Sequence, residues 1–316
     1  MTLEADFRAL EDDRDQESLE RPGRVILEDD TGPMSLPVQV RTRGRFRLNP
    51  YICAFPPLRL RFPTDSLHGT VLHGVEKVKV VTHCRDNNRY EQYVLEEYLS
   101  YRIYGILTEI GFRVQLALIT YRDRSGDEED ISRLAFLIED EDAVAERLSG
   151  VIVEAQQANP NQFDPWQAGL MYLFQYLIGN TDWSIARFHN VEGIRIGDRH
   201  FPLPYDFDFS GFVNASYAGP APVVARYIKN VRERYYWGVC SEDIDYRALF
   251  SYFNQKRESI LDLIERQPGL TGRNRTLATM YVESFFEVLN DDREAEYKIV
   301  YGCREMGGKG ANQGIP

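Results

Sequence analysis

The sequence predicts an α+β protein with two lobes: a sheet-rich N-terminal lobe with one helix, and a mostly helical C-terminal lobe. Two patterns support this prediction. Between residues 36 and 140, apolar and polar residues alternate in several short segments, with the period of a β-strand. From residue 140 onward, apolar residues recur at the three- and four-residue spacing of helices. A hydrophobic content of 43% in 316 residues is enough to form a core.

Each element of the N-terminal lobe is predicted from its own pattern. The segment EKVKVVT (76–82) alternates lysine with valine, so we expect a strand with one polar and one apolar face. Residues 88–108 carry apolar or aromatic residues at helical spacing and predict an amphipathic helix. The other strands are expected at 2–7, within 36–63, at 112–122 and at 133–139.

The C-terminal lobe is expected to contain helices and one pair of short strands. We predict helices at 140–157, 165–178, 222–236, 243–266 and 275–290, and strands at 188–195 and 200–206. Four regions follow from these elements. They are an N-terminal extension with a strand (1–35), a β-rich lobe (36–140), a helical lobe (141–303) and a disordered glycine-rich tail (304–316).

Charge and hydropathy argue against several kinds of partner. A net charge of −12 argues against a general nucleic-acid or anionic-membrane surface, and no run approaches the ~20 apolar residues of a membrane helix. The first residues are charged and carry no signal peptide. Because they begin abruptly with a strand-like TLEADF, we expect the natural start to lie upstream. The protein would then be exported, to the periplasm or outside the cell; otherwise it is cytoplasmic.

The four cysteines form no CxxC pair, which argues against a zinc site. Two interpretations remain open. The first is a pair of disulfides in an oxidising compartment, Cys53 with Cys84 and Cys240 with Cys303. The second is four unpaired, mostly buried thiols.

Carboxylates and carboxamides gather between residues 180 and 208. Asp182 is followed by Asn190, and a phosphotransferase uses such a pair as a base and a metal ligand. The structural alternative for GNTD is a helix C-cap and a turn. Further on, Asp206 and Asp208 are expected on one face of a strand, where two carboxylates repel unless a cation lies between them. The alternative is an edge strand with a polar outer face.

Basic residues supply candidate phosphate contacts. Lys79 on the predicted strand and Glu97 on the predicted helix have the order of a nucleotide-binding lysine and its glutamate partner. The alternative is a surface lysine and a solvated glutamate. Arg226, Arg232 and Arg234 could contact a transferred phosphate, but we favour a charged helix face for at least two of them.

The order of these segments resembles the CotH family of atypical protein-kinase-like proteins, over roughly residues 36–265. The segments that carry the resemblance are RTRG, KVKVVTHCRD, YVLEEYLSYRIYG, AFLIEDED, IGNTDWS with the following HN, and PLPYDFDFS. The segment AFLIEDED departs from the family, because it lacks the usual glycine-tyrosine start, and the chain resembles a divergent bacterial branch.

The resemblance implies a two-lobed protein-kinase-like fold and a role for each candidate residue. Lys79 would bind the nucleotide, with Lys77 in reserve and Glu97 as its partner, and Glu139 would meet the adenine. Asp182 would be the catalytic carboxylate. The metal ligands would be Asn190, Asp206 and, as second ligand or support, Asp208.

We therefore expect phosphoryl transfer from ATP, with Mg²⁺ or alternatively Mn²⁺, to a hydroxyl group on a protein substrate. Two other functions fit the same residues. One is a non-catalytic metal-binding or scaffold protein on a kinase-like fold. The other is a nucleotidyl (AMP) transferase. The sequence leaves the acceptor and the oligomeric state open.

Overall fold

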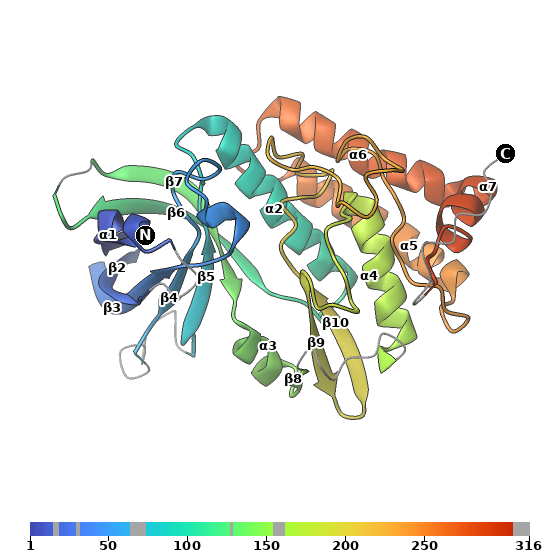
Figure 1. Cartoon of the computed structure of the whole chain (residues 1–316), viewed down its shortest axis with the longest axis horizontal. Helices are drawn as coiled ribbons and strands as arrows, with labels where there is room; N and C mark the ends of the chain where they lie inside the picture. Colours follow the sequence, from blue (N-terminus) through green and yellow to red (C-terminus); the bar gives the residue numbers. More distant parts are fainter. Residues whose placement is uncertain (15–18, 30–31, 64–73, 127–128, 154–161, 306–316) are drawn as a thin grey trace. The chain divides into compact units, whose positions relative to one another are not determined.

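The computed structural model describes residues 1–14, 19–29, 32–63, 74–126, 129–153 and 162–305 (Figure 1). The chain forms two compact units. The barrel unit comprises Met1–Tyr98 and Arg113–Ala143, and the second unit comprises Leu99–Phe112 and Val144–Pro316. Helix α2 (Asn88–Leu107) therefore belongs to the barrel unit in its first half and to the second unit in its second half.

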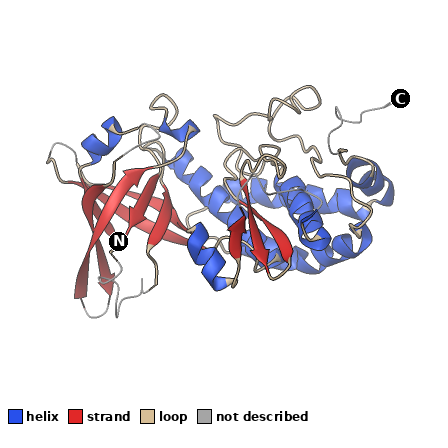
Figure 2. Cartoon of the chain, turned by 60° about the horizontal axis from the view of Figure 1, so that its bottom comes forward, coloured by secondary structure: helices blue, strands red, loops and turns tan. Residues whose placement is uncertain are grey.

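Seven strands of the barrel unit close into a barrel, drawn in red together with the smaller sheet in Figure 2. They are β1 (Thr2–Ala5), β2 (Arg21–Asp29), β3 (Gly32–Thr42), β4 (Leu58–Arg61), β5 (Lys77–Val81), β6 (Val114–Asp123) and β7 (Ile131–Glu139). Their order is β1-β2-β3-β4-β5-β7-β6. The barrel closes because β1 pairs parallel with β6, with Thr2 opposite Thr120. The other neighbours pair antiparallel.

The barrel core follows the period-2 rule of strands. In β3 the buried hydrophobic residues are Leu36, Val38 and Val40, and in β5 Val78 and Val80 face the same core. The short helix α1 (Phe7–Asp12) adds Phe7 to this core. Alternation therefore places Lys77 and Lys79 on the opposite face of β5 from Val78 and Val80.

The second unit combines helices with a small antiparallel sheet of order β10-β9-β8. Its elements are α4 (Pro165–Ile178), β8 (Val151–Val153), β9 (Val191–Ile196), β10 (Arg199–Pro204), α5 (Tyr246–Glu265), α6 (Gly272–Asn290), α7 (Asp292–Ala295) and a π-helical turn at Glu296–Val300; α3 (Glu141–Arg147) begins in the barrel unit. Helix α4 packs against β10, α5 and α6 (Figure 1).

Helix α4 has clear start and stop signals. The Asp164 side chain accepts a hydrogen bond from the backbone N–H of Gln167 at 3.0 Å, and Pro165 follows as the first helical residue. Gly179 ends the helix at φ +64°, a left-handed conformation that favours glycine. Almost every residue between these caps is buried, so the helix forms the centre of this unit.

Both cysteine pairs form disulfides. Cys53 bonds to Cys84 within the barrel unit, and Cys240 bonds to Cys303 within the second unit. The Cα atoms lie 4.5 Å and 5.0 Å apart, which is within the range of disulfides. The first of the two interpretations of the cysteines is therefore the one that the structure adopts.

The predicted two-lobed, protein-kinase-like fold is wrong. The strands of the first unit close into a seven-stranded barrel, and the second unit is not simply helical, because it contains a three-stranded sheet. Barrel closure depends on pairing between β1 and β6, which are more than a hundred residues apart, and local alternation carries no information about such a pair. Residues 1–35, expected to be an extension, supply β1 and β2.

Two helix predictions also need correction. Of the predicted helix 140–157, residues 154–157 lie outside the described residues, and the described part contains α3, which ends at Arg147, followed by β8. The predicted helix 222–236 is absent, and this segment forms turns. The predicted tail lies outside the described residues from 306 onward. None of the described helices is both long and apolar enough to cross a membrane.

A buried histidine makes the stability of the barrel unit depend on pH. His83 is 1% exposed, and its ring stacks on Phe55 at 4.8 Å. Burial lowers the pKa of His83 from 6.5 to about 4. Below pH 6.5 the unfolded chain therefore binds a proton that the folded chain does not, and the folded state loses stability as the pH falls towards 4.

We expect His83→Phe, which keeps a ring at this position, to reduce that pH dependence. Lowering the pH from 7 to 4 should cost the wild-type protein about 3 kcal/mol more unfolding free energy than the variant. Urea denaturation followed by circular dichroism at both pH values measures the difference. Equal losses in the two proteins would contradict the assignment.

Candidate functional site

The end of α4 positions Asp182. After Gly179, the buried Asn180 accepts a hydrogen bond on its Oδ1 from the backbone N–H of Asp182 at 2.9 Å. This is an Asx-turn, in which a side chain replaces a backbone acceptor. Trp183 is 3% exposed and donates its Nε1–H to the Asn180 carbonyl at 3.1 Å. Both the side chain and the backbone carbonyl of Asn180 thus hold the turn by hydrogen bonds. The Asp182 side chain stays partly exposed.

The Asp182 carboxylate contacts two neighbouring side chains, which we call the Asp182 cluster: Asp182, His189 and Asn190. His189 Nε2 lies 2.9 Å from Asp182 Oδ1. Asn190 Nδ2 donates to the Asp182 carbonyl at 2.7 Å and to Asp182 Oδ2 at 3.2 Å. The eight-residue spacing of Asp182 and Asn190 thus brings the two side chains into contact. The Asn190 amide nitrogen donates hydrogen bonds to Asp182. The amide oxygen of Asn190 is the acceptor, and it is therefore the atom suited to a cation.

The β9–β10 hairpin brings Asp206 near the cluster. Val191 at the start of β9 lies opposite Pro204 at the end of β10. The backbone N–H of Tyr205 then donates to the Asn190 carbonyl at 3.0 Å. Asn190, directly before β9, and Asp206, two residues after β10, therefore lie at the same end of this hairpin. Both have left-handed backbones, at φ +52° and +60°, which asparagine and aspartate tolerate better than most residues.

The expectation that Asp206 and Asp208 share one face of a strand is wrong. Strand β10 ends at Pro204, and the left-handed Asp206 breaks the alternation. Phe207 is fully buried, with its ring 4.6 Å from that of Tyr101, and it anchors this segment in the core. Asp208 is 3% exposed, and its Oδ2 accepts a hydrogen bond from the Tyr217 hydroxyl at 3.0 Å.

The donor set of this segment fits a hard cation. The amide oxygen of Asn190 and the carboxylates of Asp206 and Asp208 are oxygen donors, which Mg²⁺ and Mn²⁺ prefer to nitrogen or sulfur. The part of the chain that the structure describes contains no group of three or more His, Cys, Asp or Glu side chains that could hold a metal ion. Mg²⁺ needs fewer, because it is held through one or two carboxylates, substrate phosphates and water.

Lys79 lies on β5 in the barrel unit, and it is 8% exposed. Its ammonium group pairs with the carboxylate of Glu141, at the start of α3. Burial lowers the pKa of Lys79, while the charge of Glu141 opposes this shift. Lys77, the reserve candidate, pairs with Asp142 at 3.0 Å and is much more exposed.

Glu97 is buried on α2, and one oxygen of its carboxylate accepts a hydrogen bond from Arg47 Nη1 at 3.2 Å. The predicted contact between Glu97 and Lys79 stays a prediction. Glu139 ends β7, and its Oε2 accepts a hydrogen bond from the backbone N–H of Arg113 at 3.0 Å. Its proposed contact with adenine likewise stays a prediction.

Sequence reasoning missed several charged residues of the barrel unit. Arg59 pairs with the buried Asp140, Arg47 with Glu97, and Glu141 with Lys79. The acidic run EDED at the end of β7 indicated that such partners exist, because strands that carry arginine and lysine need acidic residues nearby.

The arginines of residues 226–234 lie in turns and have separate roles. Arg234 donates to the Leu177 carbonyl at 3.2 Å and 3.1 Å, and its guanidinium lies 3.8 Å from the Tyr281 ring centre. Arg232 donates to the Gly211 carbonyl at 3.1 Å. These two residues therefore support the structure. Arg226 is exposed and lines a cavity with Tyr235 and Trp237. The sequence does not predict this cavity, because its pattern favours a helix over residues 222–236.

We expect the buried pair of Arg47 and Glu97 to be needed for stability. Glu97→Ala leaves a buried guanidinium without this carboxylate and should lower the unfolding free energy by about 3–5 kcal/mol. The double variant Arg47→Met/Glu97→Leu should recover most of the loss, because it removes both charges. Urea denaturation measures all three proteins. A single variant as stable as wild type would contradict this role.

No protein-family model matches this chain, and no curated protein matches it either.

Proposed function

We propose that the protein transfers a phosphoryl group from ATP to a hydroxyl group, with a protein as acceptor and Mg²⁺ or Mn²⁺ as the metal. The observation that carries the proposal is the Asp182 cluster. A carboxylate held by a carboxamide, with Asp206 leaving the sheet beside that carboxamide, has the parts that phosphoryl transfer requires. The proposal rests on these side chains and not on a kinase fold.

In this proposal, Asp182 accepts or orients the proton of the acceptor hydroxyl. The hydrogen bonds from its neighbours fix the carboxylate, since Asn190 Nδ2 lies at one oxygen and His189 Nε2 at the other. A fixed carboxylate aligns the hydroxyl without first having to reorganise. The partial exposure of Asp182 leaves room for an acceptor to approach.

Asn190, Asp206 and Asp208 would hold the metal. A magnesium ion held there would supply positive charge that stabilises the charge developing during transfer. Asp208 keeps one oxygen on Tyr217, which orients its carboxylate. In the barrel unit, Lys79 keeps its predicted role with the nucleotide. Its burial supports that role, because a desolvated cation interacts strongly with an anion.

The two disulfides favour the exported alternative for the location of the protein. Disulfides persist in oxidising compartments and are rare in the cytosol of most organisms. We therefore propose that the acceptor, too, is a protein of such a compartment.

Asp206→Ala should weaken binding of Mg–ATP by about tenfold or more, because it removes a ligand of the metal. Asp198→Ala is the matched control, since Asp198 is an exposed carboxylate between β9 and β10. Isothermal titration calorimetry with ATP and MgCl₂ measures both variants. Undiminished binding of Mg–ATP by Asp206→Ala would contradict the assignment of Asp206 as a metal ligand. Tight calcium binding without ATP binding would favour the non-catalytic scaffold alternative.

Asp182→Asn should leave Mg–ATP binding within about threefold of wild type and lower the transfer rate by about 10²–10⁴-fold. Transfer is followed with ATP labelled at the γ-phosphate, using a mixture of exported proteins as acceptor. A parallel reaction with ATP labelled at the α-phosphate distinguishes the AMP transferase. Transfer by Asp182→Asn at the wild-type rate would exclude Asp182 as the base.

A further inference from the structure

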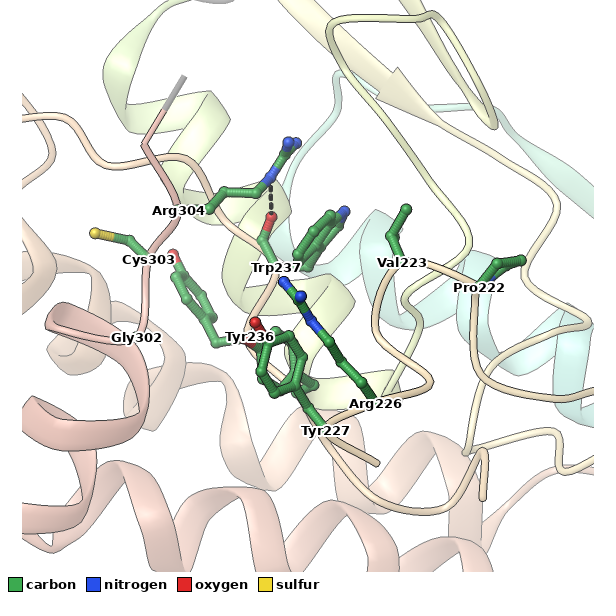
Figure 3. Close-up of a pocket in the computed structure, with 10 residues that line it drawn as sticks. Pro222, Val223, Arg226, Tyr227, Tyr236, Trp237, Gly302, Cys303 and Arg304 are labelled. Atoms are coloured by element: carbon green, nitrogen blue, oxygen red, sulfur yellow. Dashed lines mark hydrogen bonds between the residues drawn. The ribbon is translucent and has the colours of Figure 1, made fainter. Parts of the chain in front are cut away.

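A second candidate site lies apart in sequence from the Asp182 cluster, Asp206 and Asp208, and it includes Arg226. A cavity of ≈ 420 Å³ is lined by residues from the turns at 222–237 and from residues 302–304, all in the second unit (Figure 3). This volume lies in the range of small-molecule sites, about 300–1,000 Å³. None of the residues assigned to phosphoryl transfer lines it.

The wall of this cavity is fixed by covalent and backbone bonds. The backbone N–H of Arg304 donates to the Gly238 carbonyl at 2.9 Å, and the N–H of Cys240 donates to the Arg304 carbonyl at 2.9 Å. The disulfide between Cys240 and Cys303 joins the same two segments. Residues 302–304 are therefore held against residues 237–240, and the cavity is preformed.

Aromatic rings provide flat apolar surfaces in the cavity. The rings of Tyr227 and Tyr235 stack at 4.9 Å with only 7° between their planes. The ring of Trp237 lies 6.1 Å from that of Tyr235. All three are only partly buried, so each keeps some surface open to the solvent. A planar ligand can stack on such a surface, and aromatic surfaces of this kind are common in ligand sites.

Two guanidinium groups give the cavity a positive charge. Arg226 lies over the Tyr227 ring at 4.6 Å, and Arg304 lies over the Trp237 ring at 4.6 Å (Figure 3). Arg304 donates its Nε–H to the Trp237 carbonyl at 3.0 Å, while its buried Nη2 has no hydrogen-bond partner among residues 1–305 that the structure describes.

No acidic side chain among the described residues that line the cavity offsets this charge. Its described lining contains no aspartate or glutamate, although the chain as a whole has a net charge of −12. Burial also lowers the pKa of Arg304, so a nearby anion would relieve the cost of keeping this group charged.

From these contacts we propose that the cavity binds an aromatic compound that carries a phosphate or carboxylate group. The ring would stack among Tyr227, Tyr235 and Trp237, and the guanidinium groups of Arg226 and Arg304 would supply the contacts to the anion. Arginine suits this role because its planar donors match the oxygens of a phosphate or carboxylate. The site is independent of the proposed transfer reaction.

Phenyl phosphate is a suitable probe for the full-length oxidised protein. Calorimetry should show that it binds at least about tenfold more tightly than phenol or inorganic phosphate, each of which makes only part of the contacts. Quenching of Trp237 fluorescence provides a second readout, and Trp237→Phe should abolish the quenching. Equal or undetectable binding of all three compounds would overturn the proposal.

Arg226→Gln should weaken binding of phenyl phosphate by about tenfold or more, because it removes one charge-assisted contact. Arg226 is exposed, so this variant should fold normally. Arg304→Gln should have a similar effect on binding but also lose a structural hydrogen bond, so its melting temperature is measured in parallel. Arg273→Gln, on the exposed start of α6, is the matched control. Wild-type affinity in Arg226→Gln would refute the proposed anion contact.

Discussion

The C-terminal end of α4 is the constraint on which the second unit depends. Backbone carbonyls at the end of a buried helix need hydrogen-bond donors, and this end lies within the core. Arg234 supplies donors to the Leu177 carbonyl, and the left-handed Gly179 turns the chain away from the helix. The Asx-turn that holds Asp182 follows directly. A guanidinium 57 residues further along the chain than Leu177 therefore helps to hold the end of the helix from which the Asp182 turn begins.

The barrel unit is organised by a different requirement, which is that its buried charges be paired. Arg59 and Lys79 lie opposite each other on neighbouring strands, and two like charges in such positions repel. Asp140 and Glu141 follow β7 and pair with these two residues. The acidic residues after the last strand thus neutralise a positive strip across β4 and β5.

Local patterns in the sequence carried much of the secondary structure but little of the topology. The caps at Asp164 and Gly179 defined α4, because they act within a few residues. Closure of the barrel by β1 and β6 depends on contacts between distant residues, and local patterns do not encode them. The segment 222–236 has aromatic and basic residues at helical spacing, but these rings stack on one another and on arginines instead of forming a helix.

The contacts of the candidate residues differ in how far the local sequence indicates them. The contact of Asp182 with Asn190 arises from a short turn followed by a hairpin, both of which leave local signals. The specific partners of buried charges depend on which elements become neighbours, so the pairing of Arg47 with Glu97 could not be inferred, and the acidic run around Glu141 indicated only that acidic partners lie near the basic strands. The conformation of Asp206 is a single-residue departure from a strand pattern, and alternation alone does not reveal it.

The bond between Cys240 and Cys303 has a practical consequence for how the protein is handled. Cys303 precedes Arg304 in the chain. A preparation made in a reducing cytosol would therefore carry two free thiols at the cavity that Tyr227, Tyr235 and Trp237 line. Ligand binding measured on such a preparation would describe a cavity whose wall lacks this covalent link. The recombinant protein should therefore be secreted, or refolded under oxidising conditions. Its free thiols should be counted by mass spectrometry before ligand binding is measured.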